Sequence, residues 1–179
     1  MQRLIVFGLW AAACHTGLHA STLQQLSLDD MIQKSTVIVR AKPQLSYTAP
    51  HGAVIYTHYQ IQVTETYKGT PAANLDVVVP GGVSGGLRQI FAGAPVLLNG
   101  QDYVLFLWTS KNGLTQVIGL SQGLFSVSSG ASGQPMVIHA ASKELMLNAA
   151  GQPVTDSDVQ MSLSSLRTRI QSALSGGKP

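Results

Sequence analysis

Cysteine, charged residues and long apolar runs are all scarce in this sequence, and each shortage excludes a class of protein. The chain has 179 residues but a single cysteine, Cys14, so no internal disulfide can brace the fold. Charged residues make up 11% of the chain, against about 25% in an average soluble domain. The lysines and arginines are scattered and form no basic stripe, which argues against a nucleic-acid-binding protein.

The one long apolar run lies at the N-terminus, where Leu4–Ala13 follow Arg3. A positive residue before about ten apolar residues is typical of a secretory signal peptide, and the run is too short to span a bilayer. We predict cleavage between Ala20 and Ser21, which makes residues 1–20 the signal peptide. The protein is then exported to the periplasm or the medium, with no transmembrane span in its mature chain.

A lipid anchor is the alternative interpretation of the same segment. The residues Ala11-Ala12-Ala13-Cys14 partly match a lipoprotein cleavage box, whose first position is usually leucine. A lipid on Cys14 would then tether the protein to the envelope. Cleavage after Ala20 instead removes Cys14 and leaves the mature chain without a thiolate catalyst or a thiolate metal site.

Residues 21–179 predict a single β-rich domain. The clearest strand is Ile55–Tyr67, in which apolar and polar side chains alternate with the period of a half-buried strand. It is longer than an average strand, so we expect it to bend. Further strands are expected at Thr36–Ala41, Leu75–Val79, Tyr103–Trp108, Leu114–Gly119, Leu124–Val127 and Pro135–Ile138. Pro43 is expected to end or bulge the first of these.

Helices are predicted at both ends of this domain. The segment Leu26–Ile32 contains Ser27, a favourable N-cap, and aspartates near its positive end. Near the C-terminus, residues 156–174 predict an amphipathic helix that packs on the β region. Its apolar stripe consists of Val159, Leu163, Leu166, Ile170 and Leu174. About six or seven short strands with regular turn spacing indicate a bent β-barrel of the OB type, with an open β-sandwich as the alternative.

The glycine-rich stretch VVVPGGVSGGLRQIF, residues 77–91, raises the question of catalysis. It contains G-x-S-x-G, the pattern of a nucleophile elbow centred on Ser84, and Asp102 and His139 could complete a Ser-Asp-His order. An elbow needs a helix directly after the turn, but the short stretch before Gly93 leaves little room for one. A serine hydrolase that uses Ser84 therefore stands as an alternative to a binding function.

The same stretch has the glycine spacing of a phosphate-binding P-loop, but Leu87 and Arg88 stand where that motif has Lys and Ser or Thr. We instead expect a turn whose glycines adopt positive φ and which presents Arg88 at its edge. The histidines after the signal peptide, His51, His58 and His139, form no metal-ligand pattern with nearby acids, so no metal or other cofactor is expected. The candidate binding residues are Gly81, Gly82, Ser84, Gly85, Gly86 and Arg88.

Five segments together resemble a group of exported bacterial proteins. They lie within Leu26–Val127 and read LSLDDMIQKSTVIVRAK, YTHYQIQVTETYKG, VVVPGG, GAPVLLNGQDYVLFLW and VIGLSQGLFSV. That group is distantly similar to the netrin and tissue-metalloproteinase-inhibitor barrel, which implies export and an OB fold. The inhibitors hold the protease zinc with an amino-terminal cysteine and are braced by disulfides, and the mature chain would have neither. The resemblance therefore implies no catalytic residue.

These observations favour a non-enzymatic exported module that binds a protein or other envelope partner, with inhibitor-like binding as one form of that function. The glycine-rich turn and Arg88 form the expected contact region. The alternatives are a small serine hydrolase that uses Ser84 and a structural envelope lipoprotein anchored at Cys14. The patterns specify neither the partner nor the oligomeric state.

Overall fold

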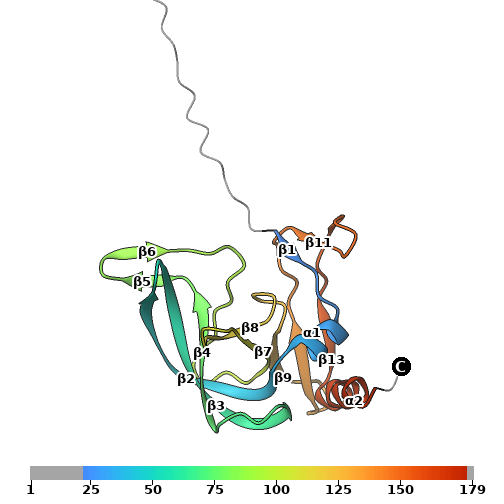
Figure 1. Cartoon of the computed structure of the whole chain (residues 1–179). Helices are drawn as coiled ribbons and strands as arrows, with labels where there is room; N and C mark the ends of the chain where they lie inside the picture. The colour runs from blue at the N-terminus through green and yellow to red at the C-terminus, as the bar shows by residue number, and fades with distance from the viewer. Residues whose placement is uncertain (1–21, 177–179) are drawn as a thin grey trace, which may run out of the picture.

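The computed structural model describes residues 22–176, which form a mainly β structure with two helices (Figure 1). The proposed signal peptide, its cleavage site at Ala20 and Ser21, and Cys14 lie outside the described residues. The strands of the main sheet are β2 (Val37–His51), β3 (Val54–Lys68), β4 (Asn74–Pro80), β7 (Tyr103–Thr109), β8 (Thr115–Val117), β9 (Leu124–Ser129), β10 (Pro135–His139) and β13 (Val159–Ser162). The shorter strands are β1 (Leu23–Gln24), β5 (Gly82–Ser84), β6 (Leu87–Gln89), β11 (Met146–Leu147) and β12 (Pro153–Val154). The helices are α1 (Leu28–Lys34) and α2 (Leu163–Leu174), and neither is long and apolar enough to cross a membrane.

The main sheet closes on itself through β7. Its strands follow the order β13-β10-β9-β7-β2-β3-β4-β8, and β8 also pairs with β7. Strands β2, β3, β4, β8 and β7 therefore form a closed circuit of pairings, in which β4 and β8 are parallel and the other pairs are antiparallel. Strands β1, β11 and β12 form a separate small sheet, and β5 and β6 form a hairpin.

The predicted long strand at 55–67 is confirmed as β3, which pairs with β2 along nearly its whole length. Register irregularities interrupt this pair after Ile38, after Arg40 and between Pro43 and Leu45. Such irregularities bend a strand and increase its twist, so β2 and β3 curve enough for the circuit to close. Pro43, which cannot donate a backbone hydrogen bond, lies at one of them, as its sequence position predicted.

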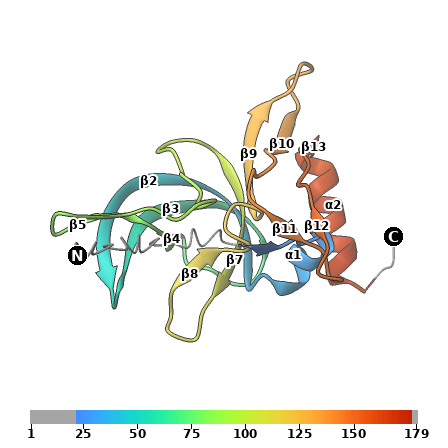
Figure 2. The same cartoon turned by 90° about the horizontal axis from the view of Figure 1, so that it is seen from above.

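Strand β7 separates two hydrophobic clusters because both of its faces are buried. Leu105 and Leu107 pack inside the circuit with residues of β2, β3 and β4. Val104 and Phe106 face the other cluster, to which β9, β10 and both helices contribute. Burial on both faces explains the nearly unbroken apolar sequence of β7. Figure 2 shows α2 beside β10 and β13, at the opposite end of the molecule from β5.

Helix α1 confirms the predicted N-terminal helix and its cap. The Ser27 side chain accepts a hydrogen bond from the Asp30 backbone N–H at 3.0 Å, and the Asp30 carboxylate accepts one from the Ser27 N–H at 3.2 Å. This capping box satisfies backbone N–H groups that the start of a helix leaves unpaired. The Asp29 carboxylate pairs with Arg169 of α2 at 2.7 Å, so charged side chains also join the two helices.

The predicted helix over residues 156–174 is wrong in its first part. Helix α2 begins at Leu163, and Val159–Ser162 form β13, which runs antiparallel to β10. The four-residue step to Leu163 fits a helix, but the segment instead pairs with the edge of β10, where Val159 lies opposite His139. The Ser162 side chain then caps α2 by accepting a hydrogen bond from the Ser165 N–H at 3.0 Å.

Candidate functional site

The glycine-rich stretch folds as the β5–β6 hairpin. Gly85 and Gly86 occupy its turn with φ of 57° and 77°, and a type I′ turn requires positive φ at both central residues. Ser84 lies at the end of β5, opposite Leu87 at the start of β6. A strand rather than a helix therefore follows the G-x-S-x-G pattern.

The residues of the serine-hydrolase alternative are engaged with other partners. The Arg40 guanidinium donates to both carboxylate oxygens of Asp102, at 2.6 to 3.1 Å. One ring nitrogen of His139 lies 3.2 Å from a carboxylate oxygen of Asp156, and the other lies 3.2 Å from a backbone carbonyl oxygen. The structure thus places neither Asp102 nor His139 in a hydrogen bond with Ser84.

Gln89 fastens the hairpin to the turn between β2 and β3. Its side-chain amide accepts a hydrogen bond from the Ile55 N–H at 2.7 Å and donates one to the Ala53 carbonyl at 2.9 Å, as a neighbouring strand would. At the base of the hairpin, a Cβ on Gly82 would lie 2.7 Å from a methyl carbon of Thr48. Gly82 is therefore required for the close approach of the hairpin to β2.

A groove of about 270 Å³ lies beside the hairpin. Three of the candidate binding residues line it, namely Gly81, Gly82 and Arg88. The other three form the tip of the hairpin: Ser84, Gly85 and Gly86. The remaining lining residues are Thr57, Tyr59, Val79, Pro80, Val83, Gln89, Ile90, Phe91, Ala94, Pro95 and Val96.

The groove combines a buried floor with an exposed apolar rim. Tyr59 and Val79 are buried, whereas Ile90 and Val96 are 76% and 69% exposed. Val83, on β5, is also more than half exposed. Large apolar side chains that cluster around a concave surface are the usual mark of an interaction site.

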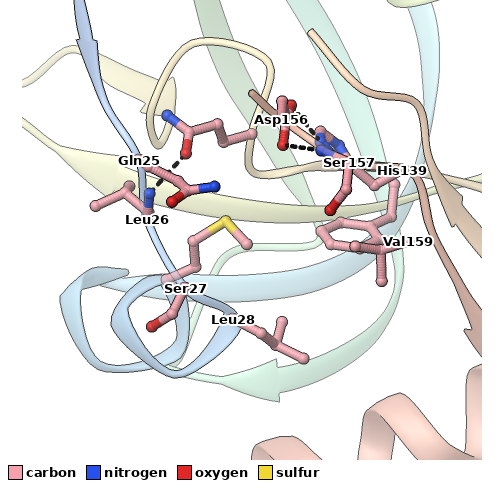
Figure 3. Close-up of a pocket in the computed structure, with 11 residues that line it drawn as sticks. Gln25, Leu26, Ser27, Leu28, His139, Asp156, Ser157 and Val159 are labelled. Carbon is pink, nitrogen blue, oxygen red and sulfur yellow. Dashed lines mark hydrogen bonds and ion pairs between the residues drawn. The ribbon is translucent and has the colours of Figure 1, made fainter. Parts of the chain in front are cut away.

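A second cavity, of about 290 Å³, lies between the segment before α1 and the segment that leads into β13 (Figure 3). Its lining is partly apolar and partly polar, and consists of Gln25, Leu26, Ser27, Leu28, Met31, Gln122, Phe125, His139, Asp156, Ser157 and Val159. The Gln122 amide accepts from the Leu26 N–H at 2.8 Å and donates to the Gln24 carbonyl at 3.0 Å. This side chain therefore pairs with the N-terminal segment as a strand would.

The His139–Asp156 pair in this cavity connects β10 to the chain before β13. Both ring nitrogens of His139 lie 3.2 Å from an oxygen atom, one in the Leu124 carbonyl and the other in the Asp156 carboxylate. Burial tends to raise the pKa of the Asp156 carboxyl. Hydrogen bonds from the Ser142 N–H, from His139 and from the Ser157 N–H outweigh that effect and lower this pKa below its usual value. These contacts fasten the chain before β13 to β10 and to residue Ser142.

The lowered pKa of Asp156 predicts a loss of stability in acid. The unfolded carboxyl has a pKa of about 3.9, so the stabilising contribution is fully present above that pH and disappears as the pH falls through the lower folded-state pKa. Asp156→Asn removes this titration. Urea denaturation from about pH 6 to pH 2 should show the wild type losing more free energy of unfolding below about pH 4 than the variant loses. If the wild type and the variant lost the same free energy of unfolding in acid, the lowered pKa of Asp156 would be contradicted.

The other two histidines of residues 22–176 lie in β2 and β3. His58 Nδ1 lies 2.8 Å from a carboxylate oxygen of Asp76, and its ring stacks on Tyr47 with the ring centroids 4.7 Å apart. His51 is exposed at the end of β2. Among residues 22–176, no group of three or more His, Cys, Asp or Glu side chains could hold a metal ion.

Sequence reasoning missed two features of these cavities. One is the pair of glutamines whose side chains bond to backbone groups as a neighbouring strand would, and the other is the His139–Asp156 pair. Gln89 and Gln122 bond to backbone groups 34 and 96 positions away along the chain, and no local pattern predicts such contacts. Ile90 could have been recognised as a candidate exposed contact residue, because it is a large apolar residue in a segment for which no strand was predicted.

Comparison of the chain with protein-family models, with curated proteins and with solved structures finds no match. Its function is therefore inferred from the geometry and chemistry of the two cavities. The polar groups of the second cavity are largely used in holding strands together, whereas the groove beside the hairpin has an exposed rim.

Proposed function

We propose that this chain is an exported module that binds a protein or other envelope partner in the groove beside the β5–β6 hairpin. The observation that carries the proposal is the exposed apolar rim formed by Val83, Ile90 and Val96. A partner that covers such side chains gains about 25 cal/mol for each Å² of apolar surface removed from water. The signal-peptide pattern of residues 1–20 supports export.

The architecture that we propose for the module is a bent β-barrel of the OB type. The circuit of pairings supports it, because β2, β3 and β4 form an antiparallel meander, β8 pairs parallel to β4, and β7 joins β8 to β2. OB folds have five strands and bind their partners on one face and in the loops. Here the hairpin and much of the groove belong to the connection between β4 and β7, and the resemblance to exported netrin-like barrels agrees with this architecture.

The chemistry of the groove supports binding without catalysis. Its lining contains no carboxylate, histidine or cysteine, and Arg88 is its one charged residue. Burial raises the pKa of the Tyr59 hydroxyl, so Tyr59 stays neutral at physiological pH. The groove therefore offers apolar surface, hydrogen-bonding groups and a single positive charge.

Ile90→Ser is expected to abolish capture of the partner without unfolding the protein, because Ile90 is exposed and adds little to the core. The tagged chain would be isolated from the periplasm, and the proteins captured with it would be identified by mass spectrometry. The mass of the isolated chain should also show Ser21 as its first residue. Leu174→Ser is the matched control, since it removes an exposed apolar residue from α2 at the opposite end of the molecule. Equal capture by both variants would place the binding surface outside the groove.

A further inference from the structure

Arg88 is the one arginine within residues 22–176 that forms no ion pair. The other three are held by carboxylates: Arg40 by Asp102, Arg167 by Glu65 and Arg169 by Asp29. A guanidinium has five N–H donors and no acceptor, and it remains protonated throughout the physiological pH range. Arg88 therefore presents an unneutralised positive charge beside an apolar groove.

No acidic side chain of the groove lining is available to neutralise Arg88. Glu144 approaches the segment that follows β6, where a Cβ on Gly93 would lie 2.7 Å from the Glu144 Cγ atom. Neither Glu144 nor Gly93 lines the groove. The complementary negative charge is therefore left for the ligand to supply.

Size and charge together select the class of ligand. The groove, at about 270 Å³, is smaller than the pockets of about 300–1,000 Å³ that enclose whole drug-sized ligands, so it suits one or two side chains of a larger partner. A second copy of the chain fits poorly, because a two-fold interface would bring the same Arg88-bearing surface to both sides. An anionic membrane also fits poorly, since lipid-binding surfaces gather about four to eight cations and this lining has one.

We propose that the groove recognises an exposed protein segment in which a carboxylate stands next to a large apolar side chain. This inference rests on the proposed binding function and names the chemistry of the partner. The apolar side chain occupies the groove beside Val79 and Phe91, and the carboxylate pairs with the Arg88 guanidinium through two parallel hydrogen bonds. An apolar segment without an acid would cover Arg88 and leave its charge desolvated and unpaired.

A phage-displayed library of random heptapeptides, panned on the full mature chain, tests this inference. The recovered peptides should combine Asp or Glu with Leu, Ile, Phe or Trp. With a synthetic version of an enriched peptide, fluorescence anisotropy should show binding weakened roughly tenfold or more by Arg88→Gln and less by Arg88→Lys. Lys111→Gln, which removes an exposed lysine between β7 and β8, is the matched charge control and should bind as the wild type does.

Failure of this inference and failure of the proposed function give different results. Peptides that lack an acid, bind the Arg88→Gln variant normally and are lost on Ile90→Ser would overturn the acidic segment but leave the groove as a binding site. Peptides whose binding survives Ile90→Ser would overturn both the acidic segment and the groove as a binding site. Recovery of no enriched peptide would also overturn the inference, and co-sedimentation with vesicles of phosphatidylethanolamine and phosphatidylglycerol would then identify a lipid surface as the ligand.

Discussion

Replacement of Leu105 or Phe106 by alanine is expected to lower the free energy of unfolding by about 2–5 and 3–5 kcal/mol, respectively. These neighbouring residues point to opposite faces of β7, and each is fully buried in a different hydrophobic cluster. Each substitution would leave a cavity lined by side chains that are already packed in position. Both substitutions are expected to lower the free energy of unfolding strongly, because one face of β7 packs inside the closed circuit and the other packs against the helix-covered part of the sheet.

Strand β3 provides the control for this result in urea denaturation. Ile61→Ala removes a fully buried side chain, whereas Gln62→Ala changes an exposed one and should alter the free energy of unfolding by at most about 0.5 kcal/mol. The two substitutions at consecutive positions of β3 should therefore lower the free energy of unfolding by unequal amounts. A loss on Leu105→Ala as small as that on Gln62→Ala would contradict a packed interior within the circuit.

The two strands that organise the fold were predictable from local patterns. Alternation over residues 55–67 predicted a strand with one buried face, and the apolar run at Tyr103–Trp108 predicted a central strand. The structure confirms both as β3 and β7. Not every pairing partner was predictable in this way, because the parallel β4–β8 pair, in which Val77 lies opposite Thr115, joins segments that are distant in sequence and carry no shared periodicity.

The candidate site was predictable only in its turn. Gly85 and Gly86 indicated positive φ, which the structure confirms, and Arg88 was expected at the edge of the turn. The groove itself depends on the Gln89 amide and on residues 94–96, which fold back to line it with β3 and β4. Such contacts are set by tertiary packing, so the sequence around the glycines could not specify the groove.

The C-terminal region shows how a free sheet edge can decide between two local structures. Val159 fits a helical stripe with Leu163, but it also begins a short alternating segment, Val159–Ser162. The edge of β10 offers unpaired backbone groups to this segment, and the two pair as β10 and β13. The helix therefore begins only where Ser162 caps it.

Leu166→Ala is expected to lower the free energy of unfolding by about 2–5 kcal/mol and the melting temperature by roughly 4–20 °C for a domain of this size. Leu166 is fully buried in the cluster that contains Ile32 of α1 and Phe106 of β7, so the substitution opens a cavity where α2 meets the sheet. Leu174→Ala is the matched control in the same helix, because Leu174 is 41% exposed and its truncation should cost little. If Leu166→Ala left the melting temperature of the isolated monomer unchanged but abolished partner capture, α2 would be an interface. The proposed contact region would then move from the groove to this helix.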